Sequence, residues 1–175
     1  NPVIPTFSQV GTAVDINQLC PSATSNCSGG TSPGVWKYTY EATIILPANC
    51  DAWHMGFDLC CRDVADNLSG GTGNNITCKT SIYTSTSPCN NSPVITSPPI
   101  PYACAGQNFN HCISINDPDG DAATYHLINP LGTGFAPIAH LAGFSATSPL
   151  NNFSLDTMTG CFTFNHPTVG LFTIE

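Results

Sequence analysis

The sequence is poor in charged residues, and this scarcity excludes several classes of partner. Charged side chains make up 8% of the 175 residues, and only three are cationic: Lys37, Arg62 and Lys79. Binding to phosphate backbones or to anionic membrane surfaces requires clustered Lys and Arg side chains. We therefore exclude nucleic acids and anionic membrane surfaces as partners. At a formal net charge of -8, the surface must be built mainly from Ser, Thr, Asn and Gly.

Segments that could form long helices are also scarce. The 15 Pro and 15 Gly are so scattered that few windows of eleven residues escape both. No apolar run approaches the ~20 residues that a membrane-spanning helix needs, and no signal peptide opens the chain. We therefore expect a mature extracellular protein, or a part of one, that does not insert into a membrane.

The sequence motifs of common hydrolases and zinc enzymes are missing. The G-x-S-x-G nucleophile elbow does not occur, because GFSAT at 143–147 lacks the final glycine. No pair of histidines has HxxxH or HExxH spacing; the five are His54, His111, His126, His140 and His166. We predict no enzymatic activity. A secreted hydrolase with two aspartates facing each other across a cleft is the competing hypothesis.

Cysteine, in contrast, is abundant. A cytosolic protein rarely carries ten cysteines without zinc-type spacing, and no CxxC pair occurs here. We therefore predict an oxidising, extracellular compartment and five disulfides. The cysteines concerned are Cys20, Cys27, Cys50, Cys60, Cys61, Cys78, Cys89, Cys104, Cys112 and Cys161.

The neighbours Cys60 and Cys61 allow a more specific prediction. Adjacent residues of a strand point to opposite faces, so we expect these two cysteines to bond to different partners. A vicinal disulfide between them is the alternative.

Short alternating segments predict an all-β fold. Residues 36–46 (WKYTYEATIIL) alternate aromatic and polar side chains with the period of a strand. Further strands are expected at 53–60, 75–85, 108–115, 123–128 and 161–165. The proline-rich stretch at 90–101, which contains an edge strand VITS, interrupts this pattern. We predict two tandem disulfide-stapled β-sandwich domains, residues 1–92 and 93–175.

Two corollaries follow from this division. Seven cysteines precede the boundary and three follow it, so complete oxidation requires a disulfide between the domains unless Cys89 belongs to the second.

The final letters GLFTIE stop in what looks like the middle of a strand. We therefore expect the sequence to be cut from a longer chain.

The second predicted domain resembles the cadherin-like and Ig-like repeats of bacterial surface proteins. The resemblance is carried by NDPDGDAATYHL, FSLDTMTGCFTF and HPTVGLFTI. The first domain resembles a segment of the very large gliding-motility adhesins of Bacteroidetes, the SprB type, which the type IX secretion system exports. The matching residues are Leu46-Pro47, Cys50 to Trp53, and Cys60-Cys61-Arg62, whereas Asp63 stands where that segment usually has Asn.

This resemblance implies a function. It suggests an Ig-like or cadherin-like repeat module of a long cell-surface adhesin filament, involved in surface attachment or gliding motility. The implied partners are adjacent repeats of the same chain and a surface polysaccharide or solid surface. An extracellular carbohydrate-binding module is the alternative function.

The stretch Asp117-Pro118-Asp119-Gly120-Asp121 is the candidate metal site. The resemblance to cadherin-like repeats implies calcium held by Asp117, Asp119 and Asp121, with Asn116 or Asp156 as further ligands. An EF-hand is excluded, because its glycine position is Ala122 and its glutamate position is Ile128. The alternative needs no ion, since Pro and Gly at these places also favour a tight turn. Calcium is thus the one predicted cofactor.

The two tryptophans have two interpretations. A β-sandwich core often contains a Trp beside its disulfides, which favours a core role for Trp53 and for Trp36. Exposed rings would instead stack on sugars, as the carbohydrate-binding alternative requires.

Glycosylation signals are present in two forms. Five asparagines lie in N-x-S/T triplets: Asn26, Asn67, Asn75, Asn90 and Asn152. In a eukaryotic secreted protein such triplets would mark surface loops, although most arise by chance in so polar a chain. The resemblance to Bacteroidetes proteins instead implies an O-glycan on Thr157, within Asp156-Thr157-Met158.

Overall fold

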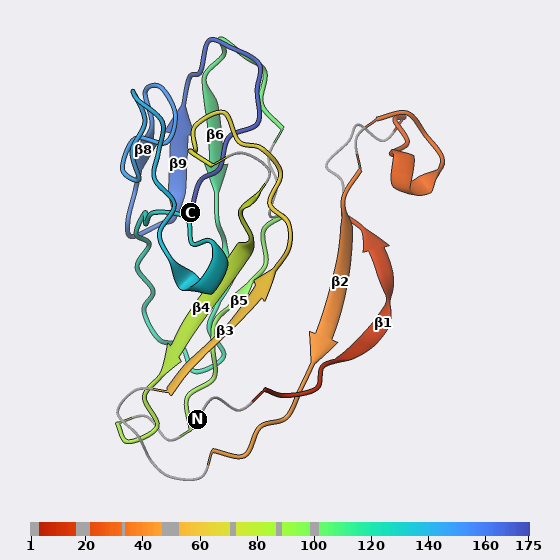
Figure 1. Cartoon of the computed structure of the whole chain (residues 1–175), viewed down its shortest axis with the longest axis vertical. Helices are drawn as coiled ribbons and strands as arrows, with labels where there is room; N and C mark the ends of the chain where they lie inside the picture. The colour runs from red at the N-terminus through yellow and green to blue at the C-terminus, as the bar shows by residue number, and fades with distance from the viewer. Residues whose placement is uncertain are drawn as a thin grey trace. The chain divides into compact units, whose positions relative to one another are not determined.

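The computed structural model of the chain describes residues 4–16, 22–32, 34–46, 53–70, 73–86, 89–98 and 102–175 (Figure 1). The chain divides into two compact units. Unit 1 comprises residues 1–49 with 100–102, and unit 2 comprises residues 50–99 with 103–175. This division differs from the boundary that the proline-rich stretch predicts, because residues 50–92 belong to the same unit as most of the second half.

The described residues form an all-β structure, which confirms the predicted class at this level. All paired strands are antiparallel, in sheets of two or three strands. Helical structure among the described residues is limited to short 3-10 turns such as η1 (Asn26–Ser28) and η3 (Thr133–Phe135). Within these residues, no helix has the length and apolar character needed to cross a bilayer.

Unit 1 contains a two-stranded ribbon. Strand β1 (Ser8–Asp15) pairs with β2 (Trp36–Glu41), and the register shifts between Val10 and Val14. Strand β2 ends at Glu41, so only the alternating part of the predicted strand at 36–46 is regular. Sequence analysis did not predict β1, whose segment SQVGTAVD contains Gly11 at φ 70° and has weak alternation.

The described residues of unit 2 form three small sheets. Strand β3 (Trp53–Leu59) forms a ladder with β4 (Ile76–Ile82), and β5 (Val94–Ile95) pairs with β7 (Ile115–Asn116). The third sheet has the order β6-β9-β8, with β6 at Phe109–Cys112, β9 at Cys161–Phe164 and β8 at Ser154–Leu155 (Figure 1).

Most predicted strands of unit 2 are confirmed, but one is wrong. The segment 123–128 forms no ladder, because its N–H groups bond to separate places: Tyr125 N donates to Thr157 O at 2.8 Å, and Ile128 N donates to Glu175 O at 2.9 Å. The predicted strand at 108–115 divides into β6 and β7.

The polar face of the β3–β4 hairpin packs against the turn η3. Thr77 Oγ1 donates to Gly132 O at 2.9 Å, and Gly134 N donates to Asp58 Oδ2 at 3.0 Å. A Cβ atom at Gly56 would lie 2.4 Å from the Phe135 ring, so only glycine allows this ring to approach the hairpin. The hairpin is thereby joined to the second half of the chain.

The apolar core of unit 2 lies against the β6-β9-β8 sheet and the neighbouring loops. Phe162 is 4% exposed and contacts the rings of His111 and Phe153, at centroid distances of 5.5 and 5.6 Å. Phe109 and Phe164 extend this ring cluster along β6 and β9. The buried aliphatic residues among those described are Leu68, Ile138 and Leu150.

Candidate functional site

The predicted calcium ligands lie in a tight turn that directly follows β7. Asp117 Oδ1 accepts hydrogen bonds from Asp119 N at 2.9 Å and Asp121 N at 3.2 Å, and Gly120 N donates to Asp117 O at 3.2 Å. Gly120 has φ 78°, the left-handed conformation that glycine adopts most readily. The Asp117 carboxylate therefore stabilises the turn by accepting hydrogen bonds from two backbone N–H groups within it.

Asp119 is also engaged, with a segment that precedes β5. Asn91 donates to its carboxylate from the backbone N–H at 2.5 Å and from the side-chain amide at 3.0 Å. These bonds, the backbone one first, lower the pKa of Asp119 below its ordinary value. No group of three or more His, Cys, Asp or Glu side chains in the described part of the chain has a metal-binding arrangement. Calcium at this turn stays a prediction.

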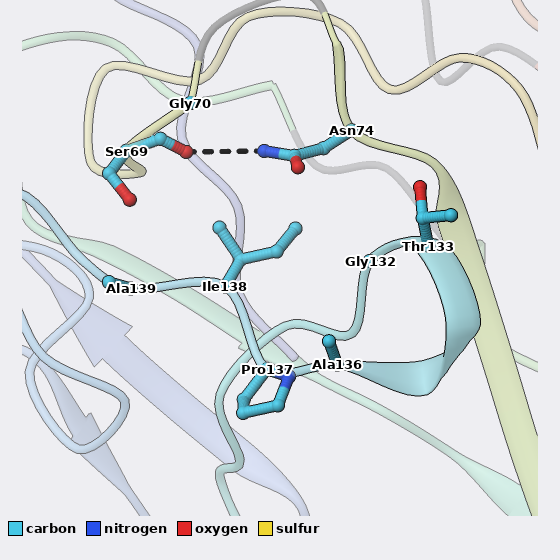
Figure 2. Close-up of a pocket in the computed structure, with 9 residues that line it drawn as sticks. All are labelled: Ser69, Gly70, Asn74, Gly132, Thr133, Ala136, Pro137, Ile138 and Ala139. Atoms are coloured by element: carbon cyan, nitrogen blue, oxygen red, sulfur yellow. Dashed lines mark hydrogen bonds between the residues drawn. The ribbon is translucent and has the colours of Figure 1, made fainter.

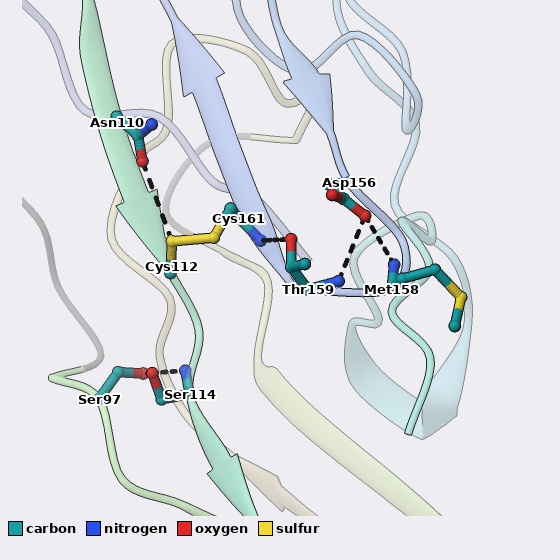
Figure 3. Close-up of a disulfide and its surroundings, with 8 residues drawn as sticks. All are labelled: Ser97, Asn110, Cys112, Ser114, Asp156, Met158, Thr159 and Cys161. Atoms are coloured by element: carbon teal, nitrogen blue, oxygen red, sulfur yellow. Dashed lines mark hydrogen bonds between the residues drawn. A yellow bond between two sulfur atoms is a disulfide. The ribbon is translucent and has the colours of Figure 1, made fainter. Parts of the chain in front are cut away.

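The described cysteines include two disulfides. Cys112 on β6 bonds to Cys161 on β9, directly opposite in the ladder, with Cα atoms 3.9 Å apart (Figure 3). Cys60 bonds to Cys61, so the expectation of two different partners is wrong. The alternation argument fails because β3 ends at Leu59 and the two cysteines lie beyond the strand.

The remaining cysteines leave the full pairing as a prediction. Cys27, Cys78, Cys89 and Cys104 form no disulfide in the structure, and Cys20 and Cys50 lie outside the described residues. Neither described disulfide crosses the predicted boundary at residue 92. Complete oxidation thus requires pairs in addition to these two.

Thr157 lies in the turn that joins β8 to β9. Asp156 Oδ1 accepts from Met158 N at 2.9 Å and Thr159 N at 3.2 Å (Figure 3). These donors, the Met158 N–H first, lower the pKa of Asp156. Thr157 itself is exposed, so an O-glycan there stays a prediction that the position permits.

The residues that sequence analysis missed form a cluster between residues 62 and 67. Asn67 is fully buried, and its amide Nδ2 donates to Pro149 O at 3.0 Å and to Thr173 O at 2.8 Å. Its Oδ1 accepts from Thr173 N at 3.0 Å. All three bonds are made inside the fold, so this triplet does not lie in a surface loop, which fits a triplet that arises by chance.

Asp66 binds the same segment at Leu171, two residues before Thr173. Its backbone N–H donates to Leu171 O at 2.7 Å, and its Oδ2 accepts from Leu171 N at 3.0 Å. A Cβ atom at Gly170 would meet Asp66 Oδ2, so a larger residue there would displace this carboxylate from Leu171 N. Asp66 and Asn67 thus pair with Leu171 and Thr173 as a neighbouring strand would, with side chains replacing part of the ladder.

Arg62 completes the cluster at Glu175. Arg62 Nη2 donates to Glu175 Oε1 at 2.6 Å, and the two side chains are 10% and 26% exposed. Leu131 N donates to Glu175 Oε2 at 3.2 Å, so both carboxylate oxygens have a partner. Arg62 Nε is buried without a partner among the described groups. We call Arg62, Asp66 and Asn67 the 62–67 clamp, and the residues they hold segment 171–175.

A shallow pocket of about 250 Å³ lies in unit 2 (Figure 2). It is formed by two loops, and Asn74 closes one side by donating from Nδ2 to Ser69 O at 3.2 Å. The lining residues carry no ionisable side chain, so they offer no acid, base or charged ligand; they are Ser69, Gly70, Asn74, Gly132, Thr133, Ala136, Pro137, Ile138 and Ala139.

The two tryptophans differ in exposure. Trp53 on β3 is half-buried, whereas Trp36 on β2 is 45% exposed. Tyr38 and Tyr40 follow Trp36 at alternate positions and are 52% and 56% exposed, so three rings share one face of the ribbon.

No known protein family, no curated protein and no solved structure matches this chain. The resemblance to gliding-motility adhesins therefore depends on the motifs quoted above.

Proposed function

We propose that this chain is a structural and adhesive repeat module of a long cell-surface adhesin filament that serves surface attachment or gliding motility. The observation that carries the proposal is the 62–67 clamp. It ties the last described residues of unit 2 to the middle of the chain through two side chains with backbone-like pairing and one partly buried ion pair. Contacts that join the two ends of unit 2 in this way resist its extension. A repeat module that acts as a spacer in a filament requires such resistance.

The proposal includes the finer architecture and the compartment. Two tandem Ig-like or cadherin-like sandwiches, stapled by disulfides and displayed outside the cell, agree with the all-β structure and with the ten cysteines. Thiol titration of the denatured native protein tests the compartment. We expect no free sulfhydryl, whereas several free thiols would contradict an extracellular module.

An in-frame deletion in the cells that produce the protein tests the function. Removing residues 1–175 from the parent gene should leave the rest of the adhesin on the surface and should shorten the filament seen by electron microscopy. Surface attachment or gliding should weaken. Unchanged attachment and filament length in the deletion strain would contradict the proposal.

Calcium belongs to the proposal as the predicted ligand of Asp117, Asp119 and Asp121. A rise in melting temperature on adding calcium, lost in an Asp121→Asn variant, would support it. Since Asp117 and Asp119 already accept backbone hydrogen bonds, an unchanged melting temperature would favour the ion-free turn.

A carbohydrate-binding module is the second candidate, and the rings on β2 favour it. Trp36, Tyr38 and Tyr40 present a row of half-exposed aromatic faces, about 7 Å apart along the strand. Because the chain has only three cations, the ligand would be a neutral polysaccharide. A glycan array tests this candidate: replacing all three rings by Ala should abolish binding, and replacing Thr39 on the opposite face should not.

A further inference from the structure

The 62–67 clamp and the Cys112–Cys161 disulfide join parts of the chain that are far apart in sequence. The clamp connects Asn67 to Thr173, which are 106 positions apart. The disulfide lies within the stretch between them and spans 49 positions. The two connections are therefore nested, with the disulfide inside the loop that the clamp closes.

We propose that the clamp is a mechanical lock. Tension applied to the two ends of the chain passes from Arg62, Asp66 and Asn67 directly to segment 171–175. Residues 68–170 lie outside this path while the lock holds. The inference deepens the proposed structural role, because it names the contacts that resist extension, and it rests on that role for its biological meaning.

The pairing order determines how these contacts open under tension. Leu171, Thr173 and Glu175 alternate along an extended segment, and each bonds to one member of the clamp. Phe172 lies between them and contacts the buried His166 ring at a centroid distance of 4.3 Å. Tension on the two ends of the chain therefore loads the Arg62–Glu175 pair first and then the contacts of Asn67 and Asp66, and the Phe172 ring is exposed as these open.

The disulfide limits further extension of unit 2 after the lock opens. Once segment 171–175 has left the clamp, tension passes through β6, the Cys112–Cys161 bond and β9. A covalent bond does not open at forces that break hydrogen bonds, so residues 113–160 stay outside the path. Extension of unit 2 is thus limited even after its first rupture.

Single-molecule pulling of the full chain from its two ends tests the proposal. When the lock opens and unit 2 extends, a Cys112→Ser/Cys161→Ser variant should gain roughly 160–170 Å more length than the native chain, because residues 113–160, which contain no other cysteine, then join the path. Should this variant fail to fold, a Cys112→Ala/Cys161→Ala variant provides the same comparison and leaves the other cysteines unchanged. Gains that do not respond to loss of the disulfide would overturn the proposed path.

Variants of the clamp test which residues form the lock. Asn67→Ala should lower the rupture force of this event, and the milder Glu175→Gln should lower it less. Asn90→Ala, a matched change at an exposed asparagine, should leave the force unchanged. Equal rupture forces in all three variants would overturn the lock even if the chain proves to be an adhesin module. Conversely, a negative result in the deletion experiment would contradict the proposed adhesin function but not the lock.

Discussion

The β6-β9-β8 sheet and segment 171–175 are both extended chain in unit 2, but different groups hold them. β9 lies between two strands, and its edge to β6 is reinforced by tilted and edge-to-face ring contacts and by a disulfide. Among the described residues no regular strand pairs with segment 171–175, and its backbone bonds instead to the side chains of Asp66 and Asn67 and to single backbone N–H groups. A ladder tolerates many side-chain changes, whereas a side-chain clamp depends on a few specific residues.

The largest effect is expected at the buried end of the clamp. Asn67→Ala removes one amide that satisfies three backbone groups, which would stay buried without partners. We expect a loss of about 3–5 kcal/mol in the free energy of unfolding, measured by urea titration. Asn90→Ala, the exposed control, should change it by less than about 0.5 kcal/mol. A small effect at Asn67 would mean that water or another group replaces the amide.

Removing the disulfide tests the sheet in the same way. The Cys112→Ser/Cys161→Ser variant opens a loop of 49 positions and should lose about 2–4 kcal/mol. The ladder and the ring cluster remain, so we expect the variant still to fold. If the loss exceeds that of Asn67→Ala, the sheet depends on its covalent bond more than the clamp depends on Asn67.

A smaller loss is expected at the ion pair. Arg62→Met leaves Glu175 with only Leu131 N as a partner and should cost about 1–2 kcal/mol, since the pair is partly exposed. Glu175→Gln keeps one acceptor oxygen but replaces the other by an amide NH2, which cannot accept from Arg62 or from Leu131 N, so it should cost a similar amount. The same urea titration measures both losses, and changes below about 0.5 kcal/mol in both variants would contradict a stabilising ion pair.

The smallest effect is expected from the acidic turns. Hydrogen bonds from backbone N–H groups lower the pKa of Asp58, Asp119 and Asp156. A lowered folded pKa adds stability above the ordinary value, near 3.9, which is lost as the pH falls through the folded value. The urea concentration at the unfolding midpoint should therefore decrease as the pH is lowered below about 4. An Asp119→Asn/Asp156→Asn variant should show a shallower fall, and a steeper one would contradict this cause.

Local periodicity predicted the strands whose own residues alternate or form short apolar runs. The alternation in WKYTYE gave β2, and the runs around residues 53 and 161 gave β3 and β9. The same reasoning placed a strand at 123–128, where the N–H groups in fact bond to distant turns. Periodicity reports which faces a segment has, but not whether a partner strand is available.

The clamp left no such pattern in the sequence. Asn67 occurs in an N-x-S triplet and a polar stretch, and both features favour a surface position. Its buried role depends on Thr173, which is 106 positions away, and on the Pro149 carbonyl. Arg62 was singled out only by the Cys-Cys-Arg resemblance. A rare cation in a chain with three could have indicated a specific partner, but nothing local indicated Glu175.

Hydrogen exchange of the native protein, measured residue by residue by NMR, tests the clamp most directly. The amides of Leu171 and Thr173 donate to Asp66 and Asn67, so we predict that both are protected in the native chain. In Asn67→Ala both should exchange much faster, while the β6 and β9 amides keep their protection. Fast exchange at Leu171 and Thr173 in the native chain, or equal loss of protection across β9 in the variant, would contradict a clamp that acts separately from the sheet.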